Sequence, residues 1–393
     1  MQYENNDKLN VARRGNTRSS RENNIFVPLM NVHIQERSYG CFIRRISLPP
    51  NYTNEREFND TSLSTNNSEF QGDLSQLIQN FDKINIKEID PIAISSIQEN
   101  PSTEIDFNMI VDEINNLIFK LLNKGFKFNL VKQQVIEYFN DHNINSQEFY
   151  NWLLNNQNSL NSIFLLGFFN YHGIETNKND EKAFNLFINS SEKNHILAQY
   201  FVGEFYLYGY GTIKNGKLAI EYYKKVVDKN FTPGQVSIGY CYSNGIGVEK
   251  DLIKEIYWYK KAAKNGNLMA IYNLGIIYED GIGIEKDNNK AFKLFKQSAE
   301  GGYLDGIMML GYCYDNGIGT KIDKYKAFEL YQNAANLGND IAQNNLALMY
   351  EEGDGIAKDT EKAIYWYEKS AKQGYGLAKN NLSNLLDNLY FDY

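Results

Sequence analysis

Leu310-Gly311-Tyr312-Cys313-Tyr314-Asp315-Asn316-Gly317-Ile318-Gly319 is the clearest copy of a motif that recurs along this chain. Successive copies are 36 residues apart, and they open at Leu166, Val202, Ile238, Leu274, Leu310 and Leu346, with a truncated seventh at Leu382. An unbroken register of this kind indicates that each unit is one supersecondary element, which cannot bury its apolar face alone. We therefore predict an all-α fold, an α-solenoid in which helix-loop-helix repeats stack as a right-handed superhelix around one core.

The first half of each unit is predicted to be a helix with one buried stripe, here called helix A. At about 100° per residue, Leu310, Cys313 and Tyr314 fall on one arc. A glycine recurs in this stripe, which predicts a close helix–helix approach with room for no more than a methyl group: Gly167, Gly203, Gly239, Gly275 and Gly311, with Ala347 in the last copy. A recurring tyrosine three residues later is predicted to be structural: Tyr206, Tyr242, Tyr278, Tyr314 and Tyr350.

The Gly-x-Gly loop that follows has a structural and a functional interpretation. A phosphate-binding loop needs a preceding strand and usually a Lys-Ser/Thr pair, neither of which accompanies these glycines. We favour a helix C-cap and a tight turn. The next Asp or Asn, such as Asp359, is predicted to cap a second helix, helix B. Helix B carries aromatic residues, as in Ala363-Ile364-Tyr365-Trp366-Tyr367, and closes on small residues and a glycine.

These features together resemble the Sel1-like repeat, a relative of the tetratricopeptide repeat. The shared pattern is Leu-Gly-x-x-Tyr-x-x-Gly-x-Gly, a Lys-Asp cap, and Lys-Ala-x-x-Trp-Tyr-x-x-Ala-Ala with a terminal glycine, over about residues 166–386. The first units depart from it, for example at Glu175, which replaces a loop glycine. The resemblance implies a non-catalytic scaffold that binds other proteins. Similar arrays follow a kinase domain in some fungal proteins, which implies a role in cytoplasmic signalling.

Composition divides the chain into three parts. Residues 1–105 are rich in Asn and Ser and contain every arginine of the chain, so we predict a disordered arm. Its stretch from Val11 to Arg45 holds seven arginines against two glutamates, a net charge of +5. It ends in Arg44-Arg45-Ile46-Ser47, which makes Ser47 a candidate phosphosite for a basophilic kinase.

Residues 106–160 are predicted to form a helical N-terminal cap, and residues 161–393 are predicted to form the array of six full units and a C-terminal stub. Three amphipathic patterns lie in the cap, with apolar residues at 110–122, 130–139 and 149–153. Because a solenoid needs a cap at each end, we expect these helices to cover the exposed N-terminal face of the array.

Several classes of function are disfavoured. A net charge of −8 argues against nucleic-acid binding by the main body, and no stretch approaches the ~20 apolar residues of a membrane span. Three cysteines and no apolar leader favour a reducing compartment, the cytoplasm with the nucleus left open. The four histidines lack metal-ligand spacing, and no kinase motif is present. We therefore predict no enzyme, no catalytic residue, no metal and no cofactor.

The remaining candidate is recognition of a peptide or helix in a groove lined by helix A. Its outward positions are apolar or aromatic: Tyr200, Val236, Tyr240, Tyr272, Ile276, Met308, Tyr312 and Leu348. The alternative is that neighbouring A helices bury these side chains against each other. By resemblance, two other functions stay open. One is a regulatory subunit of a membrane or cell-wall enzyme, like chitin synthase activators, or an adaptor in endoplasmic-reticulum quality control; the other is the regulatory remnant of a kinase–Sel1 fusion.

Overall fold

The computed structural model describes residues 106–391, so the predicted disordered arm and Ser47 lie outside the described residues. Within this range sixteen helices and no strand are present. Three helices precede the repeats: α2 (Phe107–Lys124), α3 (Phe128–Asp141) and α4 (Ser146–Asn155). The A helices are α5 (Leu160–His172), α7 (Ile196–Tyr208), α9 (Thr232–Asn244), α11 (Leu268–Asp280), α13 (Leu304–Asn316), α15 (Asp340–Glu352) and α17 (Gly376–Phe391). The B helices are α6 (Asp180–Glu192), α8 (Gly216–Val227), α10 (Leu252–Lys264), α12 (Asn288–Glu300), α14 (Lys324–Asn336) and α16 (Thr360–Lys372).

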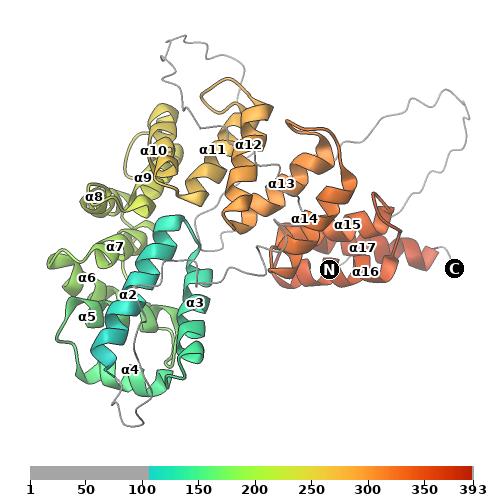
Figure 1. Ribbon diagram of the computed structural model, residues 1–393. Coiled ribbons are helices and arrows are strands. Elements are labelled where there is room, and N and C mark those ends of the chain that lie inside the picture. Colours follow the sequence, from blue (N-terminus) through green and yellow to red (C-terminus); the bar gives the residue numbers. More distant parts are fainter. Residues whose placement is uncertain (1–105, 392–393) are drawn as a thin grey trace, which may run out of the picture.

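From α5 onward each helix packs chiefly on the helices before and after it in the chain. The helices follow one another along an arch, with α2 and α3 against the first half of it (Figure 1). The predicted all-α solenoid is confirmed. Each A helix begins six residues before the motif, at Leu304 rather than Leu310 in unit five, because the preceding residues form the first helical turns.

The recurring glycine of helix A faces an aromatic ring of the B helix in its own unit. A Cβ built on Gly275 would lie 2.5 Å from Cε1 of Phe295, and one built on Gly203 would lie 2.5 Å from Cε1 of Tyr223. The predicted close approach is confirmed, but the expected room for a methyl group is wrong at these positions. The aromatic ring of helix B fills the space that a methyl group on helix A would need. The two helices therefore approach until this ring contacts the backbone of the glycine.

A repeated clamp joins helix A to helix B in units three to six. In unit six, the Asp359 carboxylate accepts a hydrogen bond from the backbone N–H of Lys362 at 3.0 Å, which confirms the predicted cap. The Asp359 N–H donates to the carbonyl of Tyr350 at 2.8 Å. The Lys362 ammonium lies 2.8 Å from Asp359 and 5.2 Å from the centre of the Tyr350 ring. The recurring tyrosine is therefore structural, as predicted.

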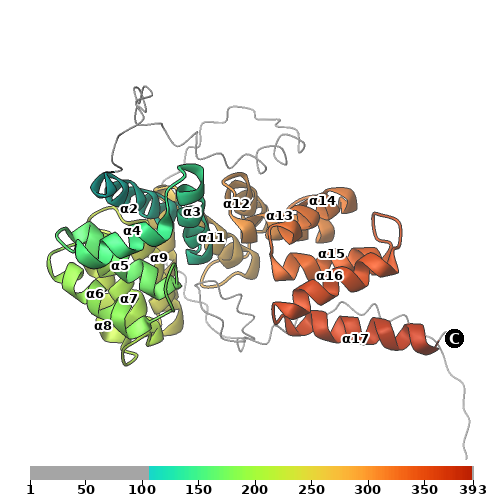
Figure 2. The same ribbon diagram turned by 90° about the horizontal axis from the view of Figure 1, so that it is seen from below.

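The N-terminal helices extend further than a cap on one end. Figure 2 shows that α4 lies beside α5, whereas α2 and α3 reach toward α9 and α11. The expectation that all three cover only the N-terminal face is corrected. Helix α2 has 18 residues, a length of roughly 27 Å, and eight of them are buried. The first repeat alone is too narrow to bury a stripe of that length, so α2 also packs on later repeats.

Candidate protein-binding face

The A face is defined here as the surface of the A helices that faces away from the B helices. Helix α2 crosses this face along the starts of successive A helices. Near its middle, Asn115 donates to the carbonyl of Asn161, which precedes Ser162 in α5, at 3.3 Å. At its end, Asn123 accepts a hydrogen bond from the Thr232 N–H at 2.8 Å and one from the Asn267 side chain at 3.3 Å. One helix thus reaches from the start of α5 to the N-cap of α11.

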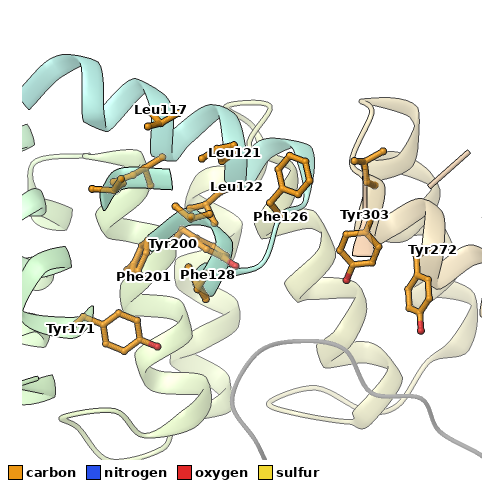
Figure 3. Close-up of a cluster of buried hydrophobic side chains, with 14 of the residues drawn as sticks. Leu117, Leu121, Leu122, Phe126, Phe128, Tyr171, Tyr200, Phe201, Tyr272 and Tyr303 are labelled. Carbon is orange, nitrogen blue, oxygen red and sulfur yellow. The ribbon is translucent and has the colours of Figure 1, made fainter. Parts of the chain in front are cut away.

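Helix α3 turns back over the same face after a short loop. Phe128, its first residue, is buried against rings from α5 and α7, with centroids 6.4 Å from Tyr171, 6.1 Å from Tyr200 and 5.0 Å from Phe201. Figure 3 shows Phe128 and the leucines of α2 among these rings, with Phe126 at the turn toward Tyr303. We call α2 and α3 the hairpin.

The tip of the hairpin reaches unit five. The Lys127 ammonium lies 2.6 Å from one carboxylate oxygen of Asp305, and the Asn339 side chain donates to the other at 3.1 Å. The same ammonium lies 6.0 Å from the centre of the Tyr303 ring. The hairpin therefore lies on the A helices of units one to three, and its tip touches only the first residues of α11 and α13.

The hairpin buries a large apolar surface against the array. Seven apolar side chains of α2 are buried: Ile110, Val111, Ile114, Leu117, Ile118, Leu121 and Leu122. Burial of such a side chain stabilises by about 1.5–3 kcal/mol, so exposing seven would cost on the order of 10 kcal/mol or more. A partner that displaced the hairpin would have to supply that free energy, which leaves units four to six as the accessible part of the A face.

The eight groove residues predicted from the sequence divide into two sets. Four are buried in the core: Tyr200, Val236, Tyr272 and Met308. Tyr200 lies against Phe128, and Tyr272 packs on Tyr303 with ring centres 5.5 Å apart. For these four the assignment is corrected, because the hairpin or the neighbouring units fill the space that a partner would need.

The other four are half-buried: Tyr240, Ile276, Tyr312 and Leu348. They occupy equivalent positions of α9, α11, α13 and α15, so they form a row across consecutive A helices. We call Ile276, Tyr312 and Leu348 the apolar row, because these three lie on the A helices of units four to six. A binding role for the row stays a prediction.

A carboxylate replaces the row residue in unit two. Glu204 is buried, and it accepts hydrogen bonds from the Tyr223 hydroxyl at 2.7 Å and the Ser237 hydroxyl at 3.1 Å. Burial raises the pKa of Glu204 to about 7, although these hydroxyl donors act against the rise. The signal in the sequence was a glutamate in a slot that is otherwise apolar or aromatic. Its burial makes it a structural group rather than a contact for a partner.

Glu204 predicts a pH dependence of stability. Since its folded pKa lies above its ordinary value of 4.5, the folded chain holds a proton that the unfolded chain releases between pH 4.5 and 7. Stability therefore falls by about 3 kcal/mol as pH rises through this window and is level above it. Glu204→Gln should remove this component when unfolding by urea is compared at both ends of the window. An unchanged slope in the variant would show that Glu204 ionises normally in the fold.

Burial also shifts the pKa of two histidines among residues 106–391. Burial lowers the pKa of His172 to about 3 and that of His195 to about 4, so both imidazoles are neutral. Cys241 and Cys313 are buried, unpaired thiols. Among residues 106–391 no group of three or more His, Cys, Asp or Glu side chains has the arrangement of a metal site. In the same range no helix is both long and apolar enough to cross a membrane.

Charge on the A helices follows a pattern that a count over the whole body conceals, although Asp315 and Glu351 face the Tyr331 and Tyr367 hydroxyls of the B helices. Helices α11, α13 and α15 together hold seven carboxylates and neither Lys nor Arg: Glu279, Asp280, Asp305, Asp315, Asp340, Glu351 and Glu352. Sorting the charges by predicted helix would have revealed this from the sequence.

Comparison with known proteins gives consistent results. The Sel1 repeat family model matches six consecutive segments, residues 160–195, 196–230, 232–267, 268–303, 304–339 and 340–375. A Sel1 repeat protein from Oxalobacter formigenes is similar in structure, with a TM-score of 0.53 and 26% identity over 68% of this chain and 97% of that one. The protective antigen c5321 of uropathogenic Escherichia coli, which displays an SLR fold, has a TM-score of 0.50 and 25% identity over 72% of this chain and 60% of that one. A search of curated proteins gave no match.

Proposed function

The chain belongs to the Sel1 repeat family, and from this premise we propose that it is a non-catalytic adaptor of cytoplasmic signalling that binds a peptide or helix of another protein on the A face of units four to six. Sel1 repeat proteins are generally scaffolds for protein interaction. The observation that carries the proposal is the apolar row, whose side chains remain half-buried on the three consecutive A helices of units four to six.

The spacing of the row suits a helical or extended segment. Packed helices lie about 8–10 Å apart. The three consecutive A helices α11, α13 and α15 contain two such intervals, so the first and third are at least about 16–20 Å apart. A segment crossing all three A helices would span at least about 20 Å, or roughly 13 residues of a helix at 1.5 Å per residue. Tyr312 lies at the centre of the row, where an aromatic residue typically contributes most to affinity.

Partner capture by matched variants tests the proposal. We expect the triple variant Ile276→Ser, Tyr312→Ser and Leu348→Ser to lose a partner that the wild-type chain captures from a lysate. The control changes Tyr257, Tyr325 and Tyr365 to Ser on the B helices, where these rings are 57%, 62% and 50% exposed. The control should retain capture.

Melting curves of both triple variants separate lost binding from lost folding. If the row variant unfolds early, each single substitution is measured in its place. Capture that depends on the B-helix tyrosines, and is indifferent to the apolar row, would contradict the proposal.

A further inference from the structure

A cleft opens at the N-terminal end of the array, between α4 and the first B helix, α6. Its volume is about 510 Å³, which is within the usual range for sites that hold a ligand. Figure 1 shows α4, α5 and α6 together at one end of the arch, away from α11, α13 and α15. The cleft is therefore separate from the A face of units four to six.

The lining of the cleft is apolar at its base and polar at its edges. Leu166 is buried, Leu186 is half-buried, and Leu154 at the end of α4 is 39% exposed. The other lining residues are polar: Gln157, Asn179, Glu181, Lys182, Asn185 and Asn189. The lining has one carboxylate and one ammonium, whose charges cancel. The cleft thus favours an uncharged ligand with apolar side chains.

Two asparagines distinguish this cleft from the surface of the later B helices. Asn185 and Asn189 are exposed and four residues apart, so they lie on the same side of α6. The same two positions hold Glu221 and Lys225 in α8, and each later B helix has Tyr, Lys or Glu at the first of them. A carboxamide has one acceptor and two donor hydrogens, which can pair with the N–H and C=O groups of an extended peptide. A helical ligand would offer few such groups, because its main chain is hydrogen-bonded internally.

The chain enters its first helix beside this cleft. Phe107, the first residue of α2, packs on α4, with ring centres 5.4 Å from Phe149 and 5.6 Å from Trp152. Leu154 of the same helix lines the cleft. The residues that lead to Asp106 therefore arrive at α4, which forms one wall of the cleft.

We propose that residues 91–98, here called the strap, occupy this cleft as an extended segment that fastens the arm to the first repeat. The strap reads Pro-Ile-Ala-Ile-Ser-Ser-Ile-Gln and has no charged residue, which matches the uncharged cleft. Its isoleucines are β-branched and favour an extended backbone. In that conformation Ile92 and Ile94 fall on one side, where they can contact the leucines at the base.

The connection to α2 has sufficient length for this contact. The twelve residues from 95 to 106 can extend to roughly 40 Å, whereas a helix with its side chains is about 10–12 Å thick. A segment on so short a tether has an effective concentration on the order of mM. Another apolar stretch, residues 25–30, is farther along the chain and lies among the arginines of the arm. The strap does not touch the A face, so this inference is independent of the proposed function.

Cysteine labelling of the full chain tests the strap. Cys41→Ser removes the cysteine of the arm, and Cys241 and Cys313 are buried. In this background, Gln157→Cys places a thiol in the cleft. We expect a maleimide to label it about tenfold more slowly when the strap is intact than when it carries Ile92→Asp and Ile94→Asp. The control, Gln147→Cys, is on the same helix but outside the cleft, and its labelling rate should not respond to the strap.

A synthetic peptide identifies the occupant. In the chain with Ile92→Asp and Ile94→Asp, a fluorescent peptide of residues 88–101 should bind and should slow the labelling of Gln157→Cys again. A peptide of residues 23–35, which contains the other apolar stretch, should not slow it.

Exchanging residues between two B helices locates the contact of this peptide. Asn185→Glu with Asn189→Lys gives α6 the residues of α8, and it should lower the affinity of the 88–101 peptide at least about fivefold, as expected for the loss of two hydrogen bonds. The reciprocal control, Glu221→Asn with Lys225→Asn on α8, should leave the affinity unchanged. If circular dichroism shows that the α6 variant is unfolded, Leu154→Asp is measured in its place.

Three results would overturn the inference. They are labelling of Gln157→Cys at the same rate with and without an intact strap, equal protection by the 23–35 peptide, and a peptide affinity that is indifferent to the change on α6. Capture of a partner through the apolar row is a separate measurement, so the failure of either proposal leaves the other standing.

Discussion

Gly275→Leu is expected to destabilise the array by more than about 3 kcal/mol, at the upper end of what overpacking costs. A Cβ at this position would lie 2.5, 2.7 and 3.0 Å from three atoms of the Phe295 ring, and that ring is fully buried. A leucine side chain here would press on this buried ring and force α11 and α12 apart. Because each unit stabilises its neighbours, the disturbance should spread to units three and five.

Unfolding by urea, followed by circular dichroism, measures the effect of Gly275→Leu. The matched control is Gly376→Ala at the start of α17, where an added Cβ meets no atom within 4 Å. We expect the control to change stability by no more than about 1 kcal/mol, the scale of a glycine–alanine exchange in a helix. If the two variants unfold at the same urea concentration, the assigned packing of α11 on α12 is wrong.

Phe128→Ala is expected to cost about 3–5 kcal/mol, the usual range for a buried phenylalanine. Phe128 contacts rings of both α5 and α7, so its loss leaves a cavity between the hairpin and the array. The control is Ile136→Ala on the same helix, where the side chain is 38% exposed. This change should cost about 1 kcal/mol or less.

Thermal melts of Phe128→Ala and Ile136→Ala distinguish two placements of the hairpin. A much lower Tm for the first variant supports a hairpin seated on the A face. Equal melting of the two would mean that the hairpin does not depend on its contacts with α5 and α7, and units one to three would then be open to partners.

The repeat architecture could be predicted because its causes are local and recur. A capping residue such as Asp359, a loop glycine such as Gly353, and a glycine such as Gly275 under an aromatic ring each satisfy a requirement within one unit. Six copies of the same requirement leave little ambiguity about the fold. The alternation of A and B helices follows from them.

The path of the hairpin could not be predicted, because it depends on contacts between residues far apart in the chain. The apolar stripe of α2 indicates that the helix is buried, but not which surface buries it. Lys127 and Asp305 are 178 residues apart and nothing in their neighbourhoods marks them as a pair. The same limit applies to Tyr272 and Ile276, which share one stripe although only Tyr272 is enclosed by a ring of the next unit, Tyr303.

The central claim is that the A face is closed in units one to three and available for binding in units four to six. Hydrogen exchange on the full chain, alone and with the partner that it captures, tests this most directly. The account predicts slow exchange in α2 and α3 in both states, and new protection confined to α11, α13 and α15 when the partner is bound. Protection that appears instead on α10, α14 and α16, or exchange from α2 and α3 that slows only with the partner, would contradict it.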